Sequence, residues 1–186
     1  NFPFLIGQGN WIDSEKLKPA DRLRRVNKHG TLAISFTGLA ECLIALTGKH
    51  HGQSHESQEL GLKIIKHMRE KTDEYTEKTN LNFVLYAAQG KSSNEYFISI
   101  DKSIYGKIKG VTDKEKYTRG FAMPEDYNVS VKDLLEIESP YHSLTNGGHY
   151  TRVELANKLK GNSEQFEKTI RLMKESGIGF GKIELN

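Results

Sequence analysis

The sequence predicts an α/β fold in which most of the strands run parallel. Three observations lead to this prediction. Strand and helix patterns alternate along the 186 residues, the stretch 31–46 passes from a strand through a tight turn into a helix, and another strand precedes a helix near the C-terminus. With 36% hydrophobic and 27% charged residues, the composition is that of one globular domain with a real core. We therefore treat residues 1–186 as a single segment without a second domain.

The stretch 31–46 is the most informative part of the chain. Its strand, 31–36, carries large apolar side chains on one face and the small Ala33 and Ser35 on the other, which indicates a strand covered on both faces. The helix that follows repeats leucines at helical spacing, and Gly48 is placed to end it. The sequence therefore predicts a strand-turn-helix unit here.

The turn and first helical residues of this unit are the first candidates for a functional site. Because ligands of parallel sheets bind at the carboxyl ends of strands, this junction, with Gly38 and Glu41, is the first place where we expect a ligand-binding site. The alternative is that the junction serves only the architecture, since every parallel crossover needs one. Cys42 is the only cysteine, so it makes no internal disulfide, and its place in the apolar helix predicts a small buried side chain.

Two predictions concern the residues before this unit. Residues 1–12 are apolar and rich in glycine without a helical period, which predicts a buried strand and a loop. Residues 19–29 begin with a proline, end before a glycine and carry a basic face, which predicts a basic amphipathic helix. The basic face either attracts phosphate or is simply solvated.

Three further helices have recognisable boundaries. Polar caps mark their starts, and a proline or a glycine marks two of their ends. The predicted helices are 55–78 after Ser54, 131–138 between Ser130 and Pro140, and 163–176 between Asn162 and Gly177. Residues 101–128 are predicted to be loops with a short helical piece near 113–117.

A polar loop separates two strands predicted at 81–87 and 96–100. It contains Gly90, Lys91 and Ser92, whose backbone and side-chain donors can wrap a phosphate. The pattern is not a P-loop, and no helix start is recognisable after it. These residues are candidate substrate-binding residues, and a plain turn between the two strands is the alternative.

The segment 140–149 is dense in turn formers and hydrogen-bonding side chains and leads into another alternating strand. His142 and His149 are seven residues apart, and Asn146 and Gly147 lie in the turn between them. The four residues are predicted either to bind substrate or to shape a bend of the backbone.

Composition excludes several classes of function. The net charge of +3 and the mixing of basic with acidic residues argue against a nucleic-acid partner. No apolar run approaches the about 20 residues of a membrane span, and the N-terminus lacks the pattern of a signal peptide. With one cysteine, we expect a cytoplasmic protein. His51 and His55 are four apart, but Ser54 begins a helix between them, so we expect no metal site there.

Several stretches together resemble the anaerobic, glycyl-radical ribonucleoside-triphosphate reductases, and they occur in the order and spacing of that family over nearly the whole chain. The matching segments are Phe4-Leu5-Ile6-Gly7-Gln8-Gly9, His29-Gly30-Thr31-Leu32, Gly38-Leu39-Ala40-Glu41, Leu46-Thr47-Gly48-Lys49-His50-His51-Gly52, Gly110-Val111-Thr112-Asp113, Pro140-Tyr141-His142-Ser143-Leu144-Thr145-Asn146-Gly147-Gly148-His149 and Met173-Lys174-Glu175-Ser176-Gly177-Ile178-Gly179-Phe180-Gly181. Each segment alone is weak, whereas the ordered series is specific.

The resemblance implies that the chain is the C-terminal portion of a ten-stranded α/β barrel and supplies barrel wall and part of a substrate pocket. Family enzymes reduce ribonucleoside triphosphates: a glycyl radical generates a cysteine thiyl radical, which abstracts a ribose hydrogen. The radical residues and a structural zinc are expected outside this chain, so we expect no cofactor and no catalytic residue within it, and no activity of the chain alone. The implied partners are the ribonucleoside triphosphate, a radical-SAM activating enzyme, a second copy of the full-length parent enzyme, and the ATP-cone domain of the family.

Two stretches depart from the family pattern. A family loop of the type Thr-Pro-Ala-Glu-Gly corresponds here to 87–93, without the Thr-Pro, and a family His-Val-Pro-Val stretch corresponds to 122–125. Both departures fall where substrate is expected to bind, so a non-catalytic nucleotide-binding or regulatory relative is the alternative function. Both ends of the sequence are expected to be cuts through a larger protein.

Overall fold

The structure, a computed structural model, describes residues 4–23, 26, 28–155 and 163–185. Strand β1 (Thr31–Phe36) pairs with β2 (Asn82–Ala87) in parallel, and β3 (Thr151–Leu155) pairs in parallel with β4 (Gly181–Leu185). The predicted α/β fold with parallel strands is confirmed. The predicted cap Asn162 lies outside the described residues.

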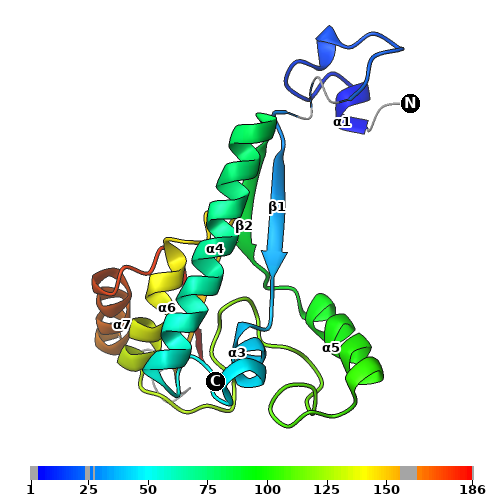
Figure 1. Cartoon of the computed structure of the whole chain (residues 1–186). Coiled ribbons are helices and arrows are strands. Elements are labelled where there is room, and N and C mark those ends of the chain that lie inside the picture. The colour runs from blue at the N-terminus through cyan, green and yellow to red at the C-terminus, as the bar shows by residue number, and fades with distance from the viewer. Residues whose placement is uncertain (1–3, 24–25, 27, 156–162, 186) are drawn as a thin grey trace.

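Helices connect and cover these strands (Figure 1). α3 (Leu39–Thr47) and α4 (His55–Thr79) follow β1, and α4 packs along β2. α5 (Lys91–Tyr105) follows β2 at its carboxyl end, and α6 (Val131–His142) packs against α4 and β3. The starts predicted after Ser54 and Ser130 are confirmed, because each serine hydroxyl accepts the backbone N–H three residues on.

The remaining helical elements are α1 (Phe4–Gly7), a 3₁₀ turn at Ser14–Lys16, and α7 (Ser163–Glu175), which lies between β3 and β4 in sequence. Three apolar clusters form the core of the described chain. The first gathers Leu39, Leu43, Ile65, Leu85, Ala87, Phe121 and Tyr141, the second gathers Leu135, Val153, Leu155 and Met173, and the third gathers Ile98, Val111 and Tyr117. Among the described residues, no helix is both long and apolar enough to cross a membrane.

The Asn-Gly-Gly turn of the sequence lies alongside β2 like a short third strand. The N–H of Gly147 donates to the carbonyl of Leu85 (2.7 Å), and the N–H of Ala87 donates to the carbonyl of Gly148 (3.0 Å). The Asn146 side-chain oxygen accepts the Leu85 N–H at 3.0 Å. These three bonds extend the β1–β2 sheet. Asn146 and Gly147 therefore shape the backbone here, as in the alternative to substrate binding given above.

Gly147 permits this approach because it has no Cβ, and we predict that Gly147→Ala destabilises the chain. An added methyl would lie 2.7 Å from Cγ2 of Val84 and 2.8 Å from the carbonyl oxygen of Leu85. Overpacking of this kind lowers the free energy of unfolding by about 1–3 kcal/mol. Urea unfolding checks the prediction, with Gly90→Ala as control because its methyl would meet only the Ser93 hydroxyl, at 3.2 Å. Equal stability of the two variants would contradict it.

Three predicted elements near the middle of the chain are wrong. Residues 96–100 lie within α5, not in a strand, because a short apolar run does not distinguish the two periods. Residues 113–117, predicted to form a short helical piece, are not helical, and the preceding helix α5 ends at Tyr105. The helix predicted to stop before Pro140 contains it and ends at His142, because a proline in the last turn removes only one backbone bond.

The predictions for the N-terminal part are also wrong. Residues 4–7 form the short helix α1, with Phe4 76% exposed, in place of a buried strand. For the helix predicted at 19–29, residues 19–23 and 28–29 are not helical, Val26 is helical, and residues 24, 25 and 27 lie outside the described residues. β1 was predicted to be covered on both faces, but Leu32 and Ile34 are 44% and 45% exposed, because in the described chain α4 packs mainly along β2 and leaves this face of β1 open.

Candidate functional site

Two adjoining cavities lie around the carboxyl ends of β1 and β2. The larger has a volume of about 1230 Å³ and the smaller about 230 Å³. Gln89, directly after β2, lines both. Most of the remaining wall comes from residues 114–127, which we call the wall loop. The wall loop crosses the ends of the strands between α3 and α5 (Figure 1).

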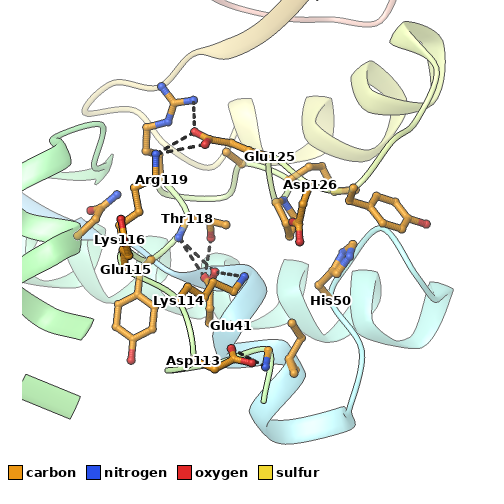
Figure 2. A pocket seen from close by; sticks show the side chains of 18 of the residues that line it. Glu41, His50, Asp113, Lys114, Glu115, Lys116, Thr118, Arg119, Glu125 and Asp126 are labelled. Carbon is orange, nitrogen blue, oxygen red and sulfur yellow. Dashed lines mark hydrogen bonds and ion pairs between the residues drawn. The ribbon is translucent and has the colours of Figure 1, made fainter. Parts of the chain in front are cut away.

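The buried carboxylate of Glu41 holds the start of the wall loop. Its side chain is 1% exposed and lies in the first turn of α3. Lys114 Nζ donates to Oε1 at 3.0 Å, and the Thr118 hydroxyl donates to Oε2 at 2.7 Å. The Thr118 N–H also donates to both oxygens, at 3.3 and 3.2 Å. Figure 2 shows Lys114 and Thr118 converging on Glu41, whose lone pairs are therefore engaged within the chain.

Gly38 brings the wall loop close to the end of β1. It adopts a left-handed conformation with φ of 72°, which favours glycine, and its N–H donates to the carbonyl of Thr118 at 2.8 Å. The next amide, of Leu39, donates to Gly120 at 3.2 Å. Gly38 through its backbone and Glu41 through its side chain thus bind the same stretch of the wall loop.

The His-His-Gly motif secures the other end of the wall loop. His51 is 2% exposed, and its Nε2 lies 2.9 Å from the carbonyl oxygen of Phe121, to which it donates. The Tyr127 hydroxyl donates to the carbonyl of Gly52 at 3.0 Å. Burial, with a contribution from the neighbouring His50, lowers the pKa of His51 to about 4. His51 is therefore a neutral anchor of the wall loop at physiological pH.

Glu138 of α6 holds the middle of the wall loop. It is 3% exposed, lines the smaller cavity, and its Oε1 accepts the N–H of Met123 at 3.0 Å. Its Oε2 accepts the hydroxyl of Thr151 at 2.6 Å. Burial raises the pKa of Glu138 to about 7, against the opposing effect of these two donors.

His142 and His149 lie beside each other, behind this carboxylate. Their ring centroids are 4.1 Å apart, and His142 Nε2 lies 2.9 Å from the Thr151 hydroxyl. His149 Nδ1 lies 2.7 Å from the hydroxyl and 2.9 Å from the carbonyl of Thr145. Burial lowers the pKa of His142 to about 4, with a contribution from His149. Both imidazoles are engaged in hydrogen bonds that shape the backbone.

The cavities carry several charged side chains that are not buried. Lys116 and Arg119 of the wall loop approach Glu125, at 3.2 and 3.8 Å (Figure 2). The Arg119 guanidinium also donates to the Tyr150 hydroxyl at 3.1 Å. Arg152 lines both cavities. These groups give the walls both signs of charge, and Lys116, Arg119 and Arg152 are each paired with a carboxylate.

The first turn of α5 is the other polar feature at this end of the sheet. Gly90 caps the helix without a side-chain bond, and no acidic residue occupies the first turn. The helix therefore presents unpaired N–H groups and the positive end of its dipole beside Ser92. The prediction that no helix follows this loop is wrong, because α5 begins at Lys91. Asn94 of the same turn lines the larger cavity.

The structure separates the predicted site residues into two groups. Glu41 lines the larger cavity, and Gln89 and Asn94, on either side of the loop 90–93, line it too. The predicted residues that are absent from the described walls of both cavities are Gly38, Gly90, Ser92, His142, Asn146, Gly147 and His149. Sequence reasoning missed Glu138 and the wall-loop residues other than 122–125, the stretch that the resemblance placed near the substrate. The position of Glu138 three residues after Leu135 and three before Tyr141, on the apolar stripe of α6, was the available signal.

Candidate metal ligands do not gather in the described part of the chain. The described residues contain no group of three or more His, Cys, Asp or Glu side chains able to hold a metal ion. Cys42 was predicted to be buried, but it is exposed on α3 and lines neither cavity in the described chain. We derive no step through a metal or a thiyl radical from these residues.

Comparison with known proteins decides the family. The whole chain, residues 1–186, matches the family described as anaerobic ribonucleoside-triphosphate reductase. The chain belongs to this family. The reductase of Salmonella typhimurium is 31% identical over 138 residues, which are 72% of this chain and 19% of the relative. That of Enterobacteria phage T4 is 30% identical over 162 residues, 86% of this chain and 25% of the relative.

Solved structures of anaerobic ribonucleotide reductases share the fold. One, described as anaerobic ribonucleotide reductase, has a TM-score of 0.73 at 16% identity over 97% of this chain and 28% of its own. Another, from Thermotoga maritima with dATP bound in the specificity site, has a TM-score of 0.72 at 14% identity over 96% of this chain and 29% of its own. The chain thus spans a fifth to a quarter of the curated anaerobic reductases above and has the fold of their barrel type.

Proposed function

We propose that this chain is part of an anaerobic reductase that converts ribonucleoside triphosphates to deoxyribonucleotides, and that the larger cavity receives the nucleotide. The observation that carries the proposal is the position of this cavity, which combines the carboxyl ends of β1 and β2 with α5 in a member of the reductase family. A volume of about 1230 Å³ is ample for a nucleotide.

We assign the triphosphate to the loop 88–93 and the first turn of α5. Backbone N–H groups at the start of a 15-residue helix favour an anion, and this helix has no side-chain cap and no acidic residue in its first turn. Gly90 leaves the backbone open to a close approach, and Ser92 is exposed and adds a hydroxyl donor. Lys91 is the first residue of α5, and a lysine carries a positive charge.

The proposal also covers the family chemistry beyond this chain. A glycyl radical in the parent enzyme would provide radical chemistry at the ribose by hydrogen-atom transfer through a cysteine. In the proposal, these residues, the zinc, the ATP-cone, the radical-SAM activating enzyme and a second subunit belong to the cytoplasmic parent enzyme outside residues 1–186. The chain itself binds and orients the triphosphate.

Charge removal at the loop tests the phosphate assignment. We expect Lys91→Ala to weaken the binding of ribonucleoside triphosphates at least tenfold in calorimetric titration, because one charged contact to phosphate is worth about 1.5–3 kcal/mol. Lys107→Ala, beyond the other end of α5, removes the same charge and is expected to change affinity less than twofold.

The loop that departs from the family pattern favours a second candidate, a nucleotide-binding relative without catalysis. Reconstituting the parent enzyme with its activating enzyme separates the two: the reductase forms deoxyribonucleotides, whereas the relative binds nucleotide without turnover. Failure of the wild-type chain to bind any ribonucleoside triphosphate at millimolar concentration would contradict both.

A further inference from the structure

The carboxylate of Glu138 joins segments that are far apart in the sequence. Within the chain it accepts the backbone N–H of Met123 in the wall loop and the hydroxyl of Thr151 at the start of β3. The side chain is 3% exposed, so these bonds replace water at both of its oxygens. Glu138 is thus a buried acceptor that links α6, β3 and the wall of both cavities.

A backbone amide fixes the direction of the hydrogen bonds behind Glu138. The N–H of Gly179 donates to His142 Nδ1 at 3.1 Å, so this nitrogen carries no proton in the neutral ring. The proton of the imidazole therefore lies on Nε2, which donates to the Thr151 hydroxyl at 2.9 Å. The Thr151 hydroxyl then has its own proton to donate to Glu138, and each member of the series has a defined role.

The position of Met123 decides the shape of both cavities. Met123 lines each of them, and its thioether lies over Gly52, where an added Cβ would be 2.8 Å from the sulfur. Its backbone N–H is buried and bonded to Glu138. A shift of that amide therefore moves the wall between the cavities.

We propose that Glu138 is a positioning residue that holds Met123 at the wall of the substrate cavity, and that Thr151 and His142 hold Glu138 in turn. The cavity wall is thereby tied to the segment around Gly179, which precedes β4. The part of this inference that concerns nucleotide rests on the proposed function, whereas the geometry of Met123 does not.

The requirement for two acceptor oxygens separates Glu138 from an ordinary core residue. A glutamine of the same size has one carbonyl oxygen and one amide group. It can accept from Met123 or from Thr151, and its amide group then faces the other donor. Thr151→Ser retains the hydroxyl, whereas Thr151→Val removes the bond to Glu138 and leaves His142 Nε2 without an acceptor.

The experiment compares Glu138→Gln with Glu136→Gln, an exposed residue of the same helix. The methyl carbon of Met123 is observed by NMR, which is practical because the chain has three methionines. Affinity for the four ribonucleoside triphosphates is measured by calorimetry. We expect Glu138→Gln to displace the Met123 resonance and to weaken nucleotide binding about tenfold, and Glu136→Gln to leave both at wild-type values.

The Thr151 pair gives the second test, including the case in which Glu138→Gln does not fold. Thr151→Val is expected to displace the Met123 resonance, and Thr151→Ser is expected to leave it in place. A wild-type Met123 resonance in Thr151→Val, or equal displacement in the two Thr151 variants, would overturn the proposal. Absence of nucleotide binding by the wild-type protein contradicts the proposed function instead, and the Met123 resonance still decides the positioning role.

Discussion

Glu41→Ala is expected to lower the free energy of unfolding by about 3 kcal/mol, the largest effect of any single substitution considered for this chain. The carboxylate is 1% exposed and accepts from the Lys114 ammonium and from the N–H and hydroxyl of Thr118. Removal leaves the N–H and the hydroxyl of the half-buried Thr118 without this acceptor. Lys114 is 28% exposed and recovers part of its hydration, which keeps the loss at the lower end for a broken buried pair.

Urea unfolding at neutral pH measures this loss, with Glu70→Ala as the control. Glu70 lies on α4, is 60% exposed and approaches Lys66 at 4.0 Å, so its removal is expected to change stability by about 0.5 kcal/mol or less. Glu41→Gln retains one oxygen and is expected to lie between the wild type and Glu41→Ala. A loss below about 1 kcal/mol for Glu41→Ala would show that the wall loop does not depend on this anchor.

His51 is expected to make the chain sensitive to acid. Its pKa in the folded state is about 4, against 6.5 when unperturbed, because the ring is buried among Phe121, Tyr141 and His50. A lowered folded pKa means that the unfolded chain binds the proton more readily. The contribution of His51 is therefore fully present above pH 6.5 and is lost as the pH falls toward 4, by about 3 kcal/mol in total.

His51→Phe isolates this contribution. At pH 7 the variant is expected to be less stable by about 1 kcal/mol, because the bond to the Phe121 carbonyl is lost. Near pH 4.5 the difference is expected to vanish or reverse. The lowered pKa of His142 acts in the same direction, and the raised pKa of Glu138 acts in the opposite one, but both are common to the two proteins.

The matched control is His55→Phe. His55 is 86% exposed beside Glu59, so its replacement is expected to leave the pH dependence of stability unchanged. Chemical unfolding between pH 4 and 7.5 measures all three proteins. Parallel pH profiles for the wild type and His51→Phe would show that His51 does not supply the acid sensitivity.

The sequence alone determined the elements whose signals are local. Alternation in residues 31–36 and 81–87, the caps at Ser54 and Ser130, and the left-handed Gly48 specify strands and helix ends through bonds within a few residues. The ordered motifs also identified the reductase family. These features are legible because propensity and capping act over one or two turns of chain.

Local signals were insufficient where tertiary contacts choose between structures. The run at 96–100 fits a strand or a helix equally, and its place in α5 depends on packing, with Ile98 buried and Tyr96 exposed. Pro140 looked like a terminator, yet α6 continues past it to His142, one turn beyond the predicted end. In both places the neighbours in space outweigh the preference of the segment.

For the candidate site as well, the sequence identified residues, and the tertiary structure decided their partners. The residues of the family motifs were found in the sequence, and the structure shows Glu41 and His51 as buried anchors of the wall loop. That role joins residues 70 or more positions apart, and no spacing within either motif encodes it. Only the tertiary structure decided that Gly38 and Glu41 hold a loop against the end of β1, because the partners of a buried polar group are set by the fold that brings them within hydrogen-bond distance.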